Sequence, residues 1–291
     1  MLDPRRLRLL VELSRRGTLA AVAEALSYSP SSVSEQLKVL ESEAGVPLLE
    51  QSGRRVRLTP QAWVLVEHAE AILDRLAEAQ DDLTRTVSGV GGTVRIAVFQ
   101  SAAHAVLPAA LTHLAEAHPD LRVEVSERAP EDGLFEVAAR GFDLAIAEEY
   151  PGYLRPRLPD LDHVAFAHDT IRAALGPDNP ARTLAELSDH PWVLEPADTA
   201  SRQWALQVCR AAGFEPDVRF ETADLMAHIR LIRSGHAVGL LPDLVWAGEK
   251  PSVTLRELPG APERVVFSAA RRAAAQRPAV RAVREALAAA V

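Results

Sequence analysis

The spacing of apolar residues near the start of the chain predicts two short helices joined by a tight turn. Thr18 and Ser29 stand at their N-cap positions, and Pro30 fits the first helical position of the second helix, where a missing N–H costs nothing. Apolar residues then recur on one face of that helix at Val33, Leu37 and Leu40. Short or polar side chains occupy the other face, namely Ser31, Ser34, Glu35, Lys38 and Ser42. This arrangement is typical of a helix-turn-helix, whose second helix lies in a DNA groove.

A single long helix is predicted over residues 61–86, which contain neither glycine nor proline. Its apolar residues are spaced alternately by four and three positions, at Leu65, Ala69, Ile72, Leu76, Ala79 and Leu83. This heptad seam favours pairing with a second copy of the chain, although such a stripe can also pack on its own domain. We interpret the glycine-rich run at 88–92 as a hinge, because it lacks the strand-before, helix-after context of a phosphate loop.

Beyond the hinge, strand and helix patterns alternate. Strands are expected at 93–99, 121–126, 142–147, 162–168, 170–175, 192–194, 217–220, 237–241, 253–257 and 264–270. Helices are expected at 103–117, 131–140, 183–188, 201–212, 224–234 and 278–290. The alternation predicts mainly parallel sheets with helices on both faces, arranged as two small α/β lobes. Chain crossings near 161–168 and 257–266 would return the last strand and helix to the first lobe.

A basic stretch follows the predicted helix-turn-helix. Arg54, Arg55 and Arg57 fall in a turn and a short strand, the form of a wing that contacts phosphates. Taken alone, these arginines would be interpreted as a solvated surface turn. A helix-turn-helix followed by a basic wing makes double-stranded DNA the expected partner.

The charge of the chain is unevenly distributed. The formal net charge is −8, yet residues 1–62 hold nine Lys and Arg against seven Asp and Glu, and residues 63–291 hold 23 against 33. DNA contact should therefore depend on a few placed arginines and not on a broad positive field. The length of 291 residues suits two or three folding units.

Neither a membrane span nor a signal peptide is visible in the sequence. Apolar runs stay well below the roughly twenty residues that a span requires, so we expect a cytoplasmic protein without membrane contact. Cys209 is the single cysteine, which fits a reducing compartment. We interpret it as a small buried hydrophobe, with a redox switch as the alternative.

Residues 2–62 resemble the N-terminal winged helix-turn-helix of LysR-type transcriptional regulators. The similarity runs from the pattern Gly17-Thr18-Leu19-x-x-Ala-x-Ala through Gly45-Val46-Pro47-Leu48-Leu49-Glu50 to Arg54-Arg55-Val56-Arg57-Leu58-Thr59-Pro60. Gly235-His236-Ala237-Val238-Gly239-Leu240-Leu241-Pro242 is similar to part of the regulatory domain of the same family. The resemblance implies a homodimer or tetramer that binds operator DNA and is switched by a small-molecule effector. It also makes RNA polymerase an expected partner.

The chain departs from this family pattern at three places. The family often has Gln then Pro after the capping serine, where this chain has Pro30 then Ser31. Arginine is frequent where Glu35 and Gln51 stand here. A carboxylate at Glu35 would repel phosphates but could accept a hydrogen bond from a cytosine amino group. Base preference therefore cannot be copied from relatives.

The expected fold is an α+β multidomain chain. It comprises a winged helix-turn-helix at 1–60, a dimerisation linker helix at 61–87, a hinge at 88–92, and a two-lobed α/β effector domain similar to periplasmic binding proteins at 93–291. Lobe I would take residues 93–163 and 266–291, and lobe II residues 164–265. The residues expected to read or flank bases are Ser31, Ser32, Ser34, Glu35, Gln36 and Lys38, with Arg54, Arg55 and Arg57 on phosphates. Thr18, Ser29 and Pro30 complete the expected DNA-binding residues.

Ligands of open α/β sheets bind beyond the carboxyl ends of the strands. The effector-binding residues that we expect from this rule are Gln100, Ser101, Ala102, Glu127, Ala147, Glu148, Asp198, Thr199, Ala200, Thr222 and Asp224. Ser101 and Thr199 stand near helix N-termini, which favour anions, whereas Glu148, Glu149 and Asp198 favour a cation. The hypothesis is therefore a zwitterionic or amine-bearing effector such as an amino acid. The alternative is that these acids simply face water.

An enzyme is the main alternative from another class. The nine histidines are scattered and include no H-E-x-x-H pair, and the chain has no G-x-S-x-G elbow. We therefore expect no catalytic residue, metal site or cofactor, although His104 and His168 could face a cleft. A second alternative is an architectural DNA-binding dimer that responds to no metabolite.

Overall fold

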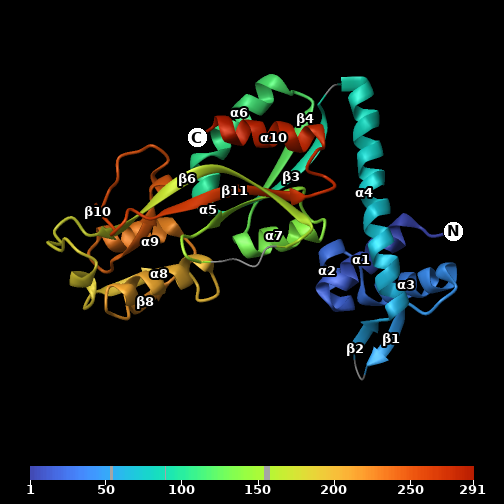
Figure 1. The fold of residues 1–291 in the computed structure, drawn as a ribbon, viewed down its shortest axis with the longest axis horizontal. Coiled ribbons are helices and arrows are strands. Elements are labelled where there is room, and N and C mark those ends of the chain that lie inside the picture. Colours follow the sequence, from blue (N-terminus) through green and yellow to red (C-terminus); the bar gives the residue numbers. More distant parts are fainter. Residues whose placement is uncertain (53–54, 89, 154–157) are drawn as a thin grey trace. The chain divides into compact units, whose positions relative to one another are not determined.

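The computed structural model describes residues 1–52, 55–88, 90–153 and 158–291. The chain divides into two compact units, Met1–Gly91 with Ala139–Gly141 and Gly92–Ala138 with Phe142–Val291. The elements of the first unit (Figure 1) are α1 (Pro4–Arg16), α2 (Leu19–Leu26), α3 (Pro30–Ala44), β1 (Leu49–Ser52), β2 (Arg55–Leu58) and α4 (Pro60–Ser88).

Capping interactions fix the ends of the helices in the first unit. The Thr18 hydroxyl accepts a hydrogen bond from the Ala21 N–H at 3.2 Å, and the Ser29 hydroxyl accepts one from the Ser32 N–H at 3.2 Å. Each bond satisfies an N–H that has no partner within the first turn of its helix. At the other end of α3, Gly45 adopts a left-handed conformation with φ 71°, which a residue with a Cβ rarely tolerates.

The helices of the first unit share one apolar core. Its fully buried large side chains are Leu7, Leu10, Leu37, Leu40 and Leu48. The Glu41 carboxylate on α3 accepts hydrogen bonds from the N–H groups of Leu48 and Leu49 at 2.8 and 2.9 Å, which fixes where the antiparallel hairpin β1–β2 begins. Arg15 on α1 pairs with Glu70 on α4 at 2.5 Å and so joins the long helix to the helix-turn-helix.

The heptad seam of α4 divides into two parts. Leu65 and Ala69 pack into the core of their own unit, as the alternative interpretation of the stripe proposed. Farther along, Ile72, Leu76 and Leu83 are 40%, 48% and 64% exposed. The structure therefore leaves the second part of the seam open to solvent in a single chain.

The second unit contains the remaining strands and helices. In chain order they are β3 (Gly92–Val98), α5 (Gln100–Ala105), α6 (Leu107–Ala117), β4 (Leu121–Glu127), α7 (Pro130–Ala138), β5 (Leu144–Glu149), β6 (Leu161–Leu175), the 3-10 helix η1 (Ala185–Leu187), β7 (Pro191–Leu194), α8 (Ala200–Ala211), β8 (Asp217–Glu221), α9 (Leu225–Arg233), β9 (Gly239–Pro242), the 3-10 helix η2 (Asp243–Trp246), β10 (Thr254–Glu257), β11 (Glu263–Arg271) and α10 (Pro278–Ala289).

The main sheet is mixed, which corrects the expectation of mainly parallel sheets. Its strand order is β10-β6-β11-β5-β3-β4, with β9 also paired to β6. Only the pairs β3–β4 and β3–β5 are parallel in this sheet, whereas β6, β9, β10 and β11 join it antiparallel within the described ranges. An alternation of strands and helices does not show in which direction a strand enters the sheet after a long connection. The antiparallel strands could therefore not be predicted from the sequence pattern alone.

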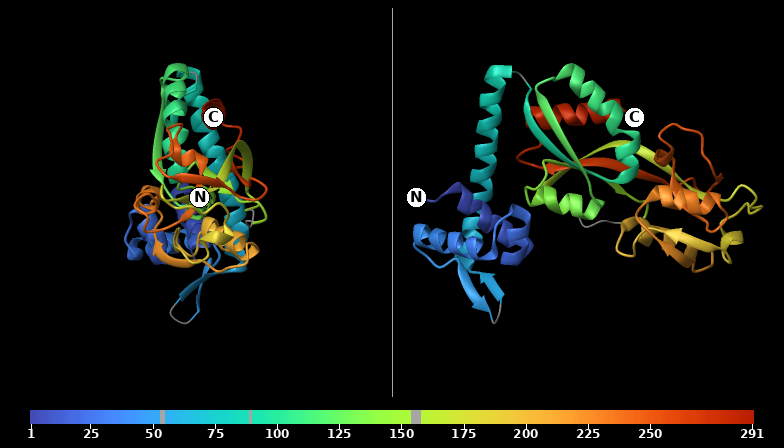
Figure 2. Two further views of the ribbon diagram at one scale, coloured as in Figure 1. Left: turned by 90° about the vertical axis from the view of Figure 1, so that its left-hand side faces the viewer. Right: turned by 180° about the vertical axis from the view of Figure 1, so that it is seen from behind.

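The two ends of the second unit have separate cores. At one end α6 and α10 cover one face of the sheet and α7 covers the other (Figures 1 and 2); we call this end lobe I. At the other end, lobe II, α8 and α9 surround the parallel pair β7–β8. The long strands β6 and β11 run side by side between the two ends. Cys209 lies fully buried in lobe II, and burial raises the pKa of its thiol to about 12, which fits the small-hydrophobe interpretation.

Some predicted elements need correction in detail. The helix expected at 103–117 is two helices, α5 and α6, because Pro108 near the start of α6 cannot donate the backbone hydrogen bond that would continue α5. The extended stretches 162–168 and 170–175 form the single strand β6. The segment expected as a helix at 183–188 contains only the short 3-10 helix η1, and the strand expected at 237–241 begins at Gly239.

Candidate nucleic-acid interface and ligand cleft

The outer face of α3 presents a row of polar side chains. Val33, Leu37 and Leu40 are buried in the core of the first unit, so the opposite side of the helix faces solvent. Exposed on that side are Pro30, Ser31, Glu35 and Lys38, while Ser32, Ser34 and Gln36 are half-buried. Ser29 and Thr18 are exposed but act as caps, so their hydroxyl oxygens already accept backbone hydrogen bonds.

Gln36 is held by a residue that the sequence patterns did not single out. The Nε of Arg6 on α1 donates to the Gln36 side-chain oxygen at 3.0 Å, and its Nη1 lies 2.6 Å from Glu43. The oxygen of Gln36 therefore has a partner within the protein, which leaves the amide NH₂ group as the part suited to reach a base. No short sequence motif links Arg6 to Gln36, because they lie on different helices.

The hairpin β1–β2 forms the wing predicted from the basic stretch. Arg57 is exposed and lies opposite Glu50 in the antiparallel register. Arg54 and the side chain of Arg55 fall outside the residues that the structure describes. Their expected contacts with phosphates stay predictions.

A cleft of about 340 Å³ lies between the loops of the two lobes. Its walls are formed by Phe99, Gln100, Ser101, Glu127, Arg128, Ala129, Pro130, Glu131, Asp132, Glu148, Glu195, Pro196, Asp198, Thr199, Ala223, Leu225 and Arg264. Six of the residues selected by the strand-end rule are among them: Gln100, Ser101, Glu127, Glu148, Asp198 and Thr199.

The other five selected residues do not line this cleft. Ala102 and Ala147 are fully buried, Ala147 within the core of lobe I, and Ala200 packs into the core of lobe II. Thr222 and Asp224 instead shape the start of α9, where the Asp224 carboxylate caps the Met226 N–H at 2.8 Å. A strand-end position can face the core as readily as the cleft, and residue order does not distinguish the two.

Gln100 joins the two lobes across the cleft. Its side-chain oxygen accepts a hydrogen bond from the Leu225 N–H at 2.7 Å, and its Nε2 lies 3.3 Å from the Asp224 carboxylate. Gln100 belongs to α5 of lobe I and the other two residues to the start of α9 in lobe II. A change in the separation of the lobes would therefore have to alter these bonds.

Arg264 lies in the cleft wall and was missed by the sequence patterns. It is only 3% exposed, and its guanidinium donates to the Asp169 carboxylate from Nε at 2.9 Å and to the Ser101 hydroxyl from Nη2 at 2.7 Å. It also lies 5.1 Å from the centre of the Phe99 ring. Burial disfavours the charge, but the surrounding Tyr150, Asp169 and Glu148 outweigh it and raise the pKa of Arg264, so the guanidinium stays protonated.

Carboxylates outnumber guanidinium groups in the cleft. Arg128 and Arg264 are accompanied by the acidic residues Glu127, Glu131, Asp132, Glu148, Glu195 and Asp198. Of these, Glu148 is 5% exposed, whereas Glu127, Asp132 and Asp198 are exposed at the surface. Since Arg264 already has anionic partners, the cleft favours a ligand with positive charge over a simple anion.

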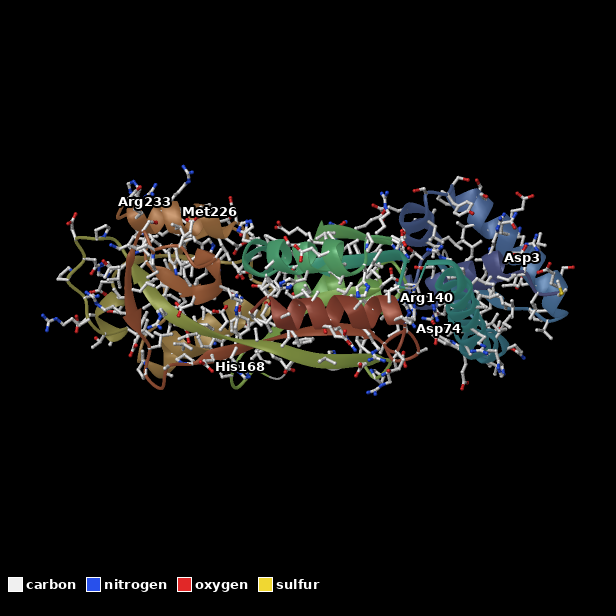
Figure 3. All side chains as sticks on the ribbon, turned by 90° about the horizontal axis from the view of Figure 1, so that it is seen from above. Asp3, Asp74, Arg140, His168, Met226 and Arg233 are labelled. Carbon is white, nitrogen blue, oxygen red and sulfur yellow. The ribbon has the colours of Figure 1, made fainter. Side chains whose placement is uncertain are left out.

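The two histidines considered as cleft residues in the sequence do not line this cleft. The histidines that could have faced it lie elsewhere: His104 is exposed on α5, and His168, labelled on β6 in Figure 3, is exposed beside Glu263. Among the described residues no group of three or more His, Cys, Asp or Glu is arranged to hold a metal ion. None of the described helices is both long and apolar enough to cross a bilayer.

Comparison with known proteins matches two segments of the chain to described families. A family described as bacterial regulatory helix-turn-helix protein, lysR family, matches residues 4–63, and one described as LysR substrate binding domain matches residues 88–291. The transcriptional dual regulator GltC of Bacillus subtilis is 26% identical over 260 residues, which cover 88% of this chain and 85% of GltC. A protein of Mycobacterium avium named probable hydrogen peroxide-inducible genes activator is 30% identical over 244 residues, covering 81% of this chain and 76% of that protein.

Solved structures share the whole fold. A full-length OxyR from Pseudomonas aeruginosa has a TM-score of 0.66 at 20% identity, with 100% of this chain and 94% of that chain covered. The LysR family regulator CbnR, solved full-length in complex with its target DNA, has a TM-score of 0.54 at 22% identity, covering 98% of this chain and all of that one. At such identities the likeness concerns the fold.

Proposed function

Because the chain belongs to the LysR family of bacterial transcriptional regulators, we propose that α3 reads operator DNA through its outer face. The observation that carries this proposal is the exposure of Ser31, Glu35 and Lys38 opposite the buried stripe of the same helix. Small and polar side chains can approach base edges in the major groove without a steric clash. Ser32, Ser34 and the amide NH₂ of Gln36 flank this row and would adjust its fit.

The wing supplies phosphate contacts in this proposal. Arg57 is exposed on β2, and Arg54 and Arg55 precede it in the sequence. Phosphate contacts position a protein on the duplex without reading its sequence, so the arginines would set affinity and α3 would set specificity. Thr18, at the start of α2, and the cap Ser29 with Pro30 would border the backbone of the DNA.

A second copy of the chain would cover the open part of the α4 seam. Ile72, Leu76 and Leu83 are large apolar side chains that a single chain leaves exposed. Pairing of the long helices would bury them and place two copies of α3 on half-sites about 34 Å apart, one turn of the duplex. Analytical ultracentrifugation of the full chain tests this; dimers or tetramers at micromolar concentration are expected, and monomers would contradict it.

The cleft between the lobes is the proposed effector site. Its walls come from both lobes, and Gln100 bonds across it, so a ligand there would alter how the lobes meet. Binding of an effector would in this way change how the protein acts on DNA and on RNA polymerase, its expected partner at a promoter.

Footprinting on the DNA upstream of the protein's own coding region tests the proposed function. We expect protection of two half-sites spaced by about one duplex turn. Purified full-length protein that protects no region, and that prefers no genomic fragment over random DNA in gel-shift assays, would contradict the proposal.

A further inference from the structure

A small chamber lies in lobe II beside the effector cleft, and Glu195 belongs to the walls of both. The chamber measures about 20 Å³, and its polar lining residues are Tyr150, Glu195, Ser201 and His228. A volume of this size holds one water-sized group. Polar and apolar atoms contribute about equally to its walls, so the polar atoms determine what can occupy it.

His228 contributes a hydrogen-bond acceptor that has no partner. Its Nε2 lies 2.8 Å from the carbonyl oxygen of Thr222, which can only accept, so Nε2 carries the proton. Burial lowers the pKa of His228, and its ring is therefore neutral with a lone pair on Nδ1. The side chain is 2% exposed, and Nδ1 makes no hydrogen bond within the described ranges. A buried polar atom without a partner costs free energy, which a ligand donor would recover.

Glu195 provides a carboxylate at the same place. Burial raises its pKa, while a hydrogen bond with Ser201 and the charge of Arg264 favour its ionised form. Arg264 does not compensate it fully, because its guanidinium is shared with Asp169 and Ser101. The chamber therefore combines the Glu195 carboxyl group, whose oxygens can accept hydrogen bonds, with the neutral acceptor of His228.

We propose that the effector of this regulator carries a primary ammonium group, which enters the chamber past Glu195 and donates to the Glu195 carboxylate and to Nδ1 of His228. This inference rests on the proposed effector site and names the chemical class of its ligand. A primary ammonium has three N–H donors on a head the size of a water molecule, so it fits both the volume and the two acceptors. A carboxylate brings no donor and would face Glu195 with like charge.

A matched series of small molecules tests the inference on the full-length protein. Diaminopropane, γ-aminobutyrate and glutarate share one trimethylene chain and differ only in whether its ends are ammonium or carboxylate. Each is titrated at millimolar concentration while the thermal midpoint and the heat of binding are measured. Both amines are expected to raise the midpoint, and glutarate is expected to leave it unchanged. A rise with glutarate alone, or with none of the three, overturns the inference.

Variants assign the binding to the chamber. Glu195→Gln keeps the shape of the side chain and removes its charge, and His228→Gln keeps a donor near Thr222 but removes the acceptor at Nδ1. Each should weaken amine binding about tenfold or more, because hydrogen bonds to charged groups are the strong ones. Glu116→Gln, which makes the same charge change on the exposed surface of α6, should leave amine binding unchanged. Equal weakening by Glu195→Gln and Glu116→Gln would mean that amines respond only to overall charge, and would overturn the inference.

The same preparations separate this inference from the proposed function. Gel-shift assays on the footprinted DNA measure operator binding independently of any amine. If operator binding is intact and the amines do not bind, only the ligand class is wrong. If operator DNA is not bound at all, the proposed function fails, whatever the amines do.

Discussion

The outer face of α3 and the wall of the ligand cleft use charged side chains in opposite ways. Glu35 and Lys38 lie on the surface of a short helix, where water solvates them and the fold does not depend on them. Arg264 and Asp169 are almost completely buried, and each compensates the charge of the other at 2.7 Å. A charged group on α3 can therefore be exchanged to change which DNA is bound, whereas a charged group at Arg264 must stay for the fold to hold.

The two regions also differ in which residues are assigned to binding and which hold the site in place. Of the acceptors that we assign to the effector, Glu195 lines the same cleft as Arg264, and Nδ1 of His228 makes no hydrogen bond among the described residues. The pair would hold Ser101 and the cleft wall in place before any ligand arrives. On α3, by contrast, positioning comes mainly from the caps and the apolar stripe, and Glu35 and Lys38 on the polar face are exposed for recognition.

The largest effect is expected from Arg264→Ala. Removing one partner of a buried pair leaves Asp169 as an uncompensated buried charge, and this costs about 3–5 kcal/mol of the free energy of unfolding. Urea denaturation of the full-length protein measures the loss in the transition of the second unit. Arg122→Ala is the matched control, because Arg122 pairs with Glu124 at 2.8 Å on the surface, and it should change stability by about 1 kcal/mol or less. Similar losses in both variants would remove the contrast between the two regions.

The range of the interactions explains how far each region could be predicted from the sequence. The start of α3 depends on Ser29, Pro30 and the next turn of the same helix, so local pattern was sufficient for it. Arg264 meets Ser101 across 163 positions of the chain and Asp169 across 95. These contacts of Arg264 depend on how the strands are arranged in the sheet, and so does the mixed character of the sheet. Hydrophobic periodicity predicts neither of them.

The cleft shows the same limit residue by residue. Glu148 lies near the carboxyl end of β5 and Thr199 caps α8, so the strand-end rule selected both, and both line the cleft. Ala147 is one position earlier on the same strand and points into the core. His228 lies on the buried face of α9 and was indistinguishable from a core histidine until the structure showed the chamber beside it.

Glu35→Ala tests the role of the exposed face of α3. Its carboxylate can accept a hydrogen bond from a base edge, and a good base contact is worth about 1–3 kcal/mol of discrimination. We expect the variant to tolerate different bases at one or two operator positions while overall affinity changes little. Binding to a library of operator variants at fixed salt measures this. Glu24→Ala, which removes an exposed carboxylate from α2, should leave base preference unchanged; equal weakening of Glu35→Ala on every sequence would argue against base reading.

Ser29→Ala tests the positioning of α3 by local structure. The Ser29 hydroxyl accepts the Ser32 N–H, and loss of such a cap costs about 1 kcal/mol. The thermal transition of the first unit should shift down accordingly, with no change in the second. Ser42→Ala is the control, since Ser42 lies exposed in the interior of the same helix, where alanine is the better helix former. A loss from Ser42→Ala as large as that from Ser29→Ala would show that the cap is not what fixes the helix.

Arg57→Ala is expected to have the smallest effect. It tests whether the wing contributes charge to DNA affinity or takes part in base recognition. Arg57 is exposed on β2, so its removal should not destabilise the fold. If it contacts one phosphate, the slope of log affinity against log salt should fall by about 0.9 per subunit, equally for specific and random duplexes. Arg57→Lys keeps the charge and should keep the slope. An unchanged slope in Arg57→Ala would exclude Arg57 from the interface, and a loss confined to specific DNA would mean that the wing, like α3, reads bases.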